Sequence, residues 1–255
     1  MASVSSIEWT QSTWNPITGC SKVSAGCKHC YAERMARRLK AMGNPSYVND
    51  FAVTLHEDLL DLPLRWRQPK LIFVNSMSDL FHESVPFEFI QATFATMQAA
   101  DWHVFQILTK RADRLTEVAG QLAWPSNVWM GVSVERQDVV WRVDRLRQVP
   151  AALRFLSCEP LLGPLQLDLD GVHWVVVGGE SGPKARPMEL DWARGIRDQC
   201  RFAGVPYFLK QLGGAVDKRG HDKALLDGRR WCERPQSVRP PLLEVARPVA
   251  ARDNG

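Results

Sequence analysis

The chain has 255 residues, of which 45% are hydrophobic and 24% are charged, and its formal net charge at pH 7 is +4. These values are typical of a folded globular protein, and the length suits either a single α/β barrel or two small domains. The small positive charge permits contact with nucleic acid without requiring it. No apolar run is long enough to span a bilayer and residues 1–6 do not resemble a secretory signal, so we expect a cytoplasmic protein with no membrane partner.

Short apolar runs rich in β-branched residues predict seven strands. They cover residues 51–55, 70–77, 103–110, 128–135, 153–159, 172–180 and 206–211, and residues 6–9 are a candidate for a short strand before them. Apolar residues recur at helical spacing over 87–100, 139–149 and 190–200. Near-continuous apolar strands suit a parallel sheet covered on both faces, and their alternation with helices indicates βαβ units. We therefore expect an α/β fold, a (β/α) barrel that is either full or partial TIM-like.

The domain organisation follows from the distribution of these elements. We expect one barrel domain over residues 1–235, with an N-terminal loop at about residues 14–34 that carries a cysteine motif. Residues 236–255 are rich in Pro and Arg, and we expect a mobile C-terminal tail there.

Successive predicted strands become polar at their C-terminal ends, where (β/α) barrels have their active sites. One interpretation is a lined barrel mouth, and the alternative is that these residues only end strands and face solvent. The polar strand-end residues are Asn75, Ser76, Ser78, Asp79, Thr109, Lys110, Ser133, Glu135, Glu159, Glu180, Lys210 and Gln211.

Three of the six cysteines, Cys20, Cys27 and Cys30, lie within eleven residues at the spacing C-x6-C-x2-C. In a reducing compartment such crowding indicates metal ligands rather than disulfides. Three thiolates could hold an iron–sulfur cluster and leave one iron open to substrate. A structural zinc site that also uses His29 or a distant ligand is an alternative, in a non-enzymatic module that binds nucleic acid or protein. A third possibility is that the thiols are unligated.

The segments 15–20 and 26–32 resemble the cluster loop of radical S-adenosylmethionine (SAM) enzymes, in particular those of the spore photoproduct lyase branch. The first gap of the motif is three residues longer than the usual C-x3-C-x2-C of that superfamily. Over roughly residues 5–235 the chain also resembles a phage-associated family of three-cysteine proteins. That second resemblance rests on the motifs NSMSDLFHE at 75–83, LTKR at 108–111, CEPLLG at 158–163, GGESG at 178–182, FLKQLGG at 208–214 and LDGR at 226–229.

The resemblance implies a radical SAM type of barrel with a [4Fe–4S] cluster on the three cysteines and SAM on the fourth iron. Such an enzyme generates a 5′-deoxyadenosyl radical for a lyase- or transferase-like reaction. The resemblance also implies a nucleic-acid base as substrate, hence DNA or RNA as partner, and a reducing electron donor such as flavodoxin or ferredoxin. Basic residues of a predicted helix, Arg34, Arg37, Arg38 and Lys40, suit a nucleic-acid backbone but equally an ordinary solvated face.

Residue roles follow from the resemblance as hypotheses. Catalytic or substrate-side roles are assigned to Cys158, Glu159, Glu180 and Lys210. Cys158 is the candidate hydrogen donor, because spore photoproduct lyases use an additional cysteine; a buried structural cysteine is the alternative. The residues expected around SAM are Tyr31, Asn75, Ser76, Ser78, Asp79, Thr109, Lys110, Ser133 and Glu135.

Overall fold

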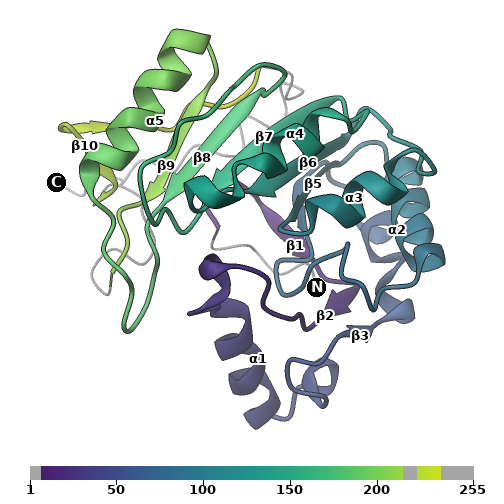
Figure 1. Cartoon of the computed structure of the whole chain (residues 1–255). Helices are drawn as coiled ribbons and strands as arrows, with labels where there is room; N and C mark the ends of the chain where they lie inside the picture. Colours follow the sequence, from purple (N-terminus) through teal and green to yellow (C-terminus); the bar gives the residue numbers. More distant parts are fainter. Residues whose placement is uncertain (1–6, 215–222, 237–255) are drawn as a thin grey trace, which may run out of the picture.

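The main sheet has seven parallel strands in a computed structural model that describes residues 7–214 and 223–236 (Figure 1). The strands follow one another across the sheet in chain order, and within the described residues the first and last do not pair with each other. The sheet is therefore a partial (β/α) barrel with open edges, as expected. Its strands are β1 (Ser12–Trp14), β4 (Leu71–Val74), β5 (Val104–Thr109), β6 (Val128–Ser133), β7 (Leu153–Cys158), β8 (Trp174–Gly178) and β9 (Tyr207–Gln211).

Four helices lie along the outer face of this sheet, α2 (Phe87–Ala99), α3 (Ala112–Ala119), α4 (Trp141–Arg147) and α5 (Leu190–Ala203) (Figure 1). Outward-facing strand residues such as Ile107 and Met130 pack with helix residues such as Phe94 and Leu115 in one fully buried core. Both faces of the strands are covered, which explains why their sequences are nearly continuous apolar runs. None of the described helices is long and apolar enough to cross a membrane.

The inner face of the sheet is filled by aromatic rings at the N-terminal ends of the strands. Trp9 lies among them, with ring centroids 4.8 Å from Phe73 and 6.0 Å from Trp174. On β6, Gly131 makes room for Phe155, because a Cβ there would lie 2.5 Å from the phenyl ring. The N-terminal half of the half-barrel is thus a packed core, and a cavity opens toward the C-terminal ends of the strands.

The N-terminal segment corrects two sequence expectations. The first barrel strand is β1 at residues 12–14, not 6–9. The run at 51–55 contributes only β3 (Thr54–Leu55), which pairs antiparallel with β2 (Ile17–Thr18) outside the main sheet. Two residues on each side are too few for a barrel strand. The remaining elements of this segment are η1 (Ala25–Cys27), α1 (Tyr31–Ala41), η2 (Pro45–Tyr47), η3 (Glu57–Leu59) and η4 (Leu62–Arg65), and η5 (Gln137–Val139) precedes α4.

Residues 223–236 cover the open edge of β9. After the hairpin of β10 (Leu225–Leu226) and β11 (Arg229–Arg230), the carbonyl of Trp231 accepts a hydrogen bond from Leu209 N at 2.8 Å. Arg234 donates to the carbonyl of Glu8 at 2.8 Å, so this segment links β9 to the start of the described chain. The division into a barrel domain and a tail stays a prediction, and residues 237–255 of the expected tail lie outside the described part.

Candidate functional site

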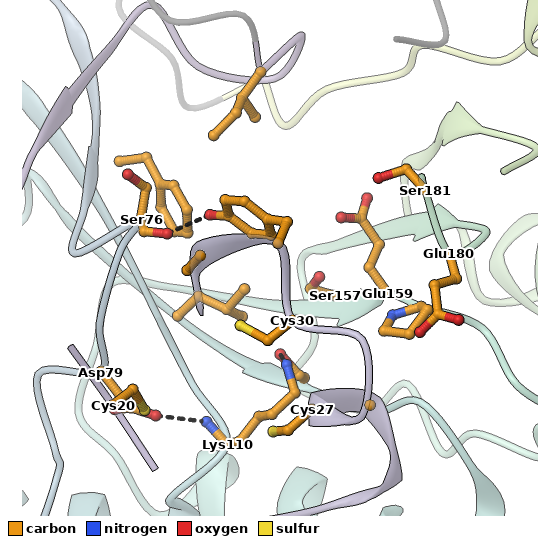
Figure 2. Close-up of a pocket in the computed structure, with 18 of the residues that line it drawn as sticks. Cys20, Cys27, Cys30, Ser76, Asp79, Lys110, Ser157, Glu159, Glu180 and Ser181 are labelled. Carbon is orange, nitrogen blue, oxygen red and sulfur yellow. Dashed lines mark hydrogen bonds between the residues drawn. The ribbon is translucent and has the colours of Figure 1, made fainter. Parts of the chain in front are cut away.

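A cavity of about 380 Å³ opens at the C-terminal ends of the strands. It is lined by the three motif cysteines and by every other residue expected at the site except Glu135 and Cys158. In the view of Figure 2, Cys20 and Asp79 lie on the left of this cavity, Glu159, Glu180 and Ser181 on the right, and Cys30 between them. The strand ends converge because parallel strands in sequential order bring their carboxyl ends to one rim.

The cysteine loop leaves the barrel through a tight turn at Gly19. Gly19 has φ +82, and a Cβ at this position would overlap the carbonyl oxygen of Ala52. Cys20 N donates to the carbonyl of Phe51 at 3.1 Å, which places the thiol at the cavity wall. Burial and the nearby Asp79 carboxylate raise the pKa of Cys20 to about 11, against the opposing effect of Arg111. The thiol form of Cys20 is therefore favoured over the thiolate in this environment.

Glu135 holds the middle of the cysteine loop. Its side chain is fully buried and accepts hydrogen bonds from Gly26 N at 3.2 Å and from the Ser24 hydroxyl. Its other oxygen pairs with the buried guanidinium of Arg142 at 3.0 Å. Although burial opposes ionisation, Lys110, Ser24 and Arg142 lower the pKa of Glu135. Glu135 was expected to line the SAM site; instead it supports the loop from outside the cavity, because its carboxylate is turned toward the loop backbone.

Glu180, at the end of β8, holds the last part of the same loop. Its Oε2 lies 2.9 Å from Nδ1 of His29 and accepts hydrogen bonds from the backbone N–H and Nε of Arg186, at 2.9 and 3.0 Å. Despite burial, which acts the other way, Arg186 and His29 lower the pKa of Glu180 to about 2. Glu180 lines the cavity as expected, but its carboxylate is already engaged with the protein.

The rim near β4, β5 and β6 is a network of hydrogen bonds. The Asp79 carboxylate accepts from Thr109 Oγ1 at 2.7 Å, from Lys110 N at 3.1 Å and from Phe81 N at 3.0 Å. The ammonium of Lys110 donates to Ser133 Oγ at 3.0 Å. Asp79, Lys110 and Ser133 all line the cavity, and the Asp79 carboxylate is engaged by three donors of the protein.

Other polar side chains of this wall are hydrogen-bonded to the backbone, and one of them also has an unpaired donor. The Ser78 hydroxyl donates to the carbonyl of Ile17 at 2.8 Å, and the Tyr31 hydroxyl donates to the carbonyl of Ser76. Asn75 accepts from Ile17 N at 3.3 Å, while its buried Nδ2 has no partner among residues 7–214 and 223–236. An orphaned donor on the cavity wall is the kind of group that a ligand satisfies.

On the opposite side, Lys210 and Glu159 form an ion pair at 2.7 Å. Glu159 Oε1 and the Ser157 hydroxyl are buried and have no hydrogen-bond partner among the described residues. Lys210 and Glu159 are partly exposed at this wall, with side chains 21% and 16% exposed.

Residues 4–235 match the family model described as "Protein of unknown function (DUF5131)". The chain belongs to this family. The family model covers the whole partial barrel, the cysteine loop and the segment at the β9 edge. No curated protein matches the sequence.

Solved structures similar to this DUF5131 chain include spore photoproduct lyase with bound AdoMet and dinucleoside spore photoproduct, at 12% identity and a TM-score of 0.44. The same lyase complexed with dinucleoside spore photoproduct gives 12% and 0.45, and a cysteine-to-serine mutant gives 13% and 0.46. These matches cover 78%, 78% and 80% of this chain, which spans 63%, 63% and 64% of the lyase chains. Likeness at this level assigns no reaction.

The placement of Cys158 in this DUF5131 chain corrects its expected role. Cys158 is fully buried in the core between the sheet and the helices, and it does not line the cavity. Burial raises the pKa of its thiol well above the ordinary value. Because strand residues alternate between faces, Ser157 and Glu159 point inward where Cys158 points outward. A hydrogen-donor role for Cys158 is not compatible with this position.

The three cysteines line one cavity, but the described residues contain no group arranged to hold a single metal ion. All three line a single cavity whose volume lies in the range of cofactor pockets, about 300–1,000 Å³. Across residues 7–214 and 223–236, no three His, Cys, Asp or Glu side chains lie close enough together to hold one metal ion. The donor set itself, three cysteines facing one space, is that of an iron–sulfur site.

Proposed function

We propose that the protein is a radical SAM enzyme that holds a [4Fe–4S] cluster and acts on a nucleic-acid base. One observation carries the proposal: Cys20, Cys27 and Cys30 line the same cavity as the polar ends of β4 to β9. A structural metal site needs no such lined cavity. The resemblance of the cysteine loop to that of radical SAM enzymes supports the same conclusion.

The three cysteines would hold the cluster, with Lys110, Ser133 and the orphaned Nδ2 of Asn75 beside them for the polar groups of SAM. When bound, cluster and SAM supply a 5′-deoxyadenosyl radical upon one-electron reduction, for which we propose a flavodoxin or ferredoxin as donor. The protein's own task is to orient the substrate and exclude water.

The substrate would bind at the wall formed by Ser157, Glu159 and Lys210. The Lys210–Glu159 ion pair lies at this wall beside Ser157, and neither Glu159 Oε1 nor the Ser157 hydroxyl has a partner among the described residues. The aromatic rings below, including Trp9 and Phe73, close the cavity floor. Such a wall can fix the orientation of a flat heterocycle through hydrogen bonds to its edge.

The first experiment is anaerobic reconstitution with iron and sulfide, followed by metal analysis and EPR with and without SAM. We expect about four irons per chain, a reduced-cluster signal that changes on adding SAM, and release of 5′-deoxyadenosine. C30A should lose the cluster, whereas C232A is the matched control, because Cys232 is exposed and outside the cavity. Stoichiometric zinc and no cluster would replace this proposal by the zinc-binding module, for which the described residues offer no separate support.

Nucleic acid as the partner rests on the helix that follows the motif. Tyr31 is 49% exposed and lines the cavity, and Arg34 and Arg38 follow it on one face of α1. We expect R34A/R38A to weaken binding of single-stranded DNA or RNA and to lower the salt slope of the affinity by about 2. R201A, on α5, is the control. Equal salt slopes for wild type, R34A/R38A and R201A would show that α1 is not part of the nucleic-acid site.

A further inference from the structure

Arg111 lies between β5 and α3, and its side chain, only 4% exposed, faces the first motif cysteine. Its Nη2 donates to the hydroxyl of Ser21 at 2.8 Å and to the carbonyl of Ser21 at 3.2 Å, and lies 4.0 Å from the sulfur of Cys20. Its Nη1 donates to the carboxylate of Glu83. The guanidinium is therefore held in place from two sides with one edge against the sulfur.

Two carboxylates and one histidine lie near Arg111. Asp79 lies 4.0 Å from Nε, and its buried carboxylate acts on Cys20 in the opposite sense to Arg111. Glu83 is 65% exposed, so water screens its charge. His82 lies 2.9 Å from the Ser21 hydroxyl, and burial together with Arg111 lowers its pKa. Within the described residues, Arg111 is the cationic side chain hydrogen-bonded to a motif sulfur.

We propose that Arg111 sets the reduction potential of a cluster bound at Cys20, by donating a hydrogen bond to the sulfur and placing a buried positive charge beside it. The inference rests on the proposed function. Reduction adds an electron to the cluster, and hydrogen bonds and positive charge at the ligand sulfur favour the electron-rich state. The potential with Arg111 present is accordingly higher than it would be without it.

If Arg111 only holds the loop through Ser21, the midpoint potentials of the variants should follow a different pattern. S21A removes the hydroxyl that Arg111 contacts but leaves the sulfur contact in place. R111Q removes the charge and the donor to sulfur. R114Q changes the net charge equally, but Arg114 pairs with Glu117 on the outer helix and does not reach the motif.

The test is EPR-monitored redox titration of the reconstituted full-length protein. We expect a more negative midpoint potential for R111Q, an intermediate one for R111K, and wild-type values for S21A and R114Q. R111Q with four irons and an unchanged potential would overturn the inference, as would an equal shift in S21A. If R111Q holds no cluster, R111K provides the test, and an unchanged potential in R111K contradicts the role of the hydrogen bond. A wild-type protein that takes up no iron contradicts the proposed function itself, which is a separate result.

Discussion

Glu135, just after β6, accepts a hydrogen bond from the backbone N–H of Gly26 at 3.2 Å. This contact joins a strand end of the half-barrel to the middle of the cysteine motif, 109 residues earlier in the chain. With the contacts of Arg111 to Ser21 and of Glu180 to His29, it fixes the cysteine motif at three points, two of them within C-x6-C. The extra residues of the motif are therefore supported by the barrel and are not a loose insertion.

The first prediction concerns this contact. E135A should lower the free energy of unfolding by about 3–5 kcal/mol, because it leaves the buried Arg142 without its partner. It should also reduce iron uptake, since the loop loses its acceptor at Gly26. Urea unfolding and iron analysis measure the two effects. E135Q keeps an acceptor of similar shape, so its iron content should exceed that of E135A; equal iron in E135A and wild type would show that the loop needs no support from β6.

The second prediction concerns the packed half of the barrel. G131A should lower the free energy of unfolding by about 1–3 kcal/mol, because the added Cβ would lie 2.5 Å from the Phe155 ring and force it to move. G120A is the matched control. No atom lies within 4 Å of a Cβ at Gly120, and its φ of −69 suits alanine, so stability should be unchanged or higher by about 0.5 kcal/mol. Similar thermal unfolding of both variants would contradict the close approach of β6 and β7.

The third prediction is a pH dependence at Glu180. Its pKa is lowered from 4.5 to about 2 in the folded protein, where burial opposes ionisation but Arg186 and His29 favour it. Ionised Glu180 therefore stabilises the fold above about pH 4.5, and this contribution is lost as the pH falls toward 2. Wild type should be more stable than E180Q at pH 7, and the difference should shrink between pH 4.5 and 2. Urea unfolding at several pH values measures it, and a pH-independent difference would contradict the assignment.

The fourth prediction separates the role of Asp79 from that of Ser133. D79N should lower the free energy of unfolding by about 1–3 kcal/mol, because an amide NH2 in place of Oδ2 cannot accept the hydrogen bond of Lys110 N. S133A should leave stability nearly unchanged and weaken SAM binding to the reconstituted protein. Calorimetry for stability and equilibrium dialysis with SAM provide the readouts. A D79N protein that keeps wild-type stability but loses SAM binding would show that Asp79 binds the cofactor.

Most of the barrel could be predicted from the sequence because six of its strands are buried on both faces and end in polar residues. The edge strand β1 could not be predicted, since three residues are too few to show the apolar periodicity of a strand. Strand alternation could have placed Cys158 in the core, because Glu159 and Cys158 cannot face the same side of β7. The supporting role of Glu135 could not be predicted, since a contact across 109 residues leaves no local signal.

The connection between Glu180 and His29 has a consequence for biosynthesis. The two residues are 151 positions apart, so the cysteine loop leaves the ribosome long before the last strand end that holds it has been made. During that interval the three thiols belong to an unsupported segment of a nascent chain. The loop therefore reaches its final position only after the synthesis of β8, although its cysteines are translated before every strand of the main sheet except β1.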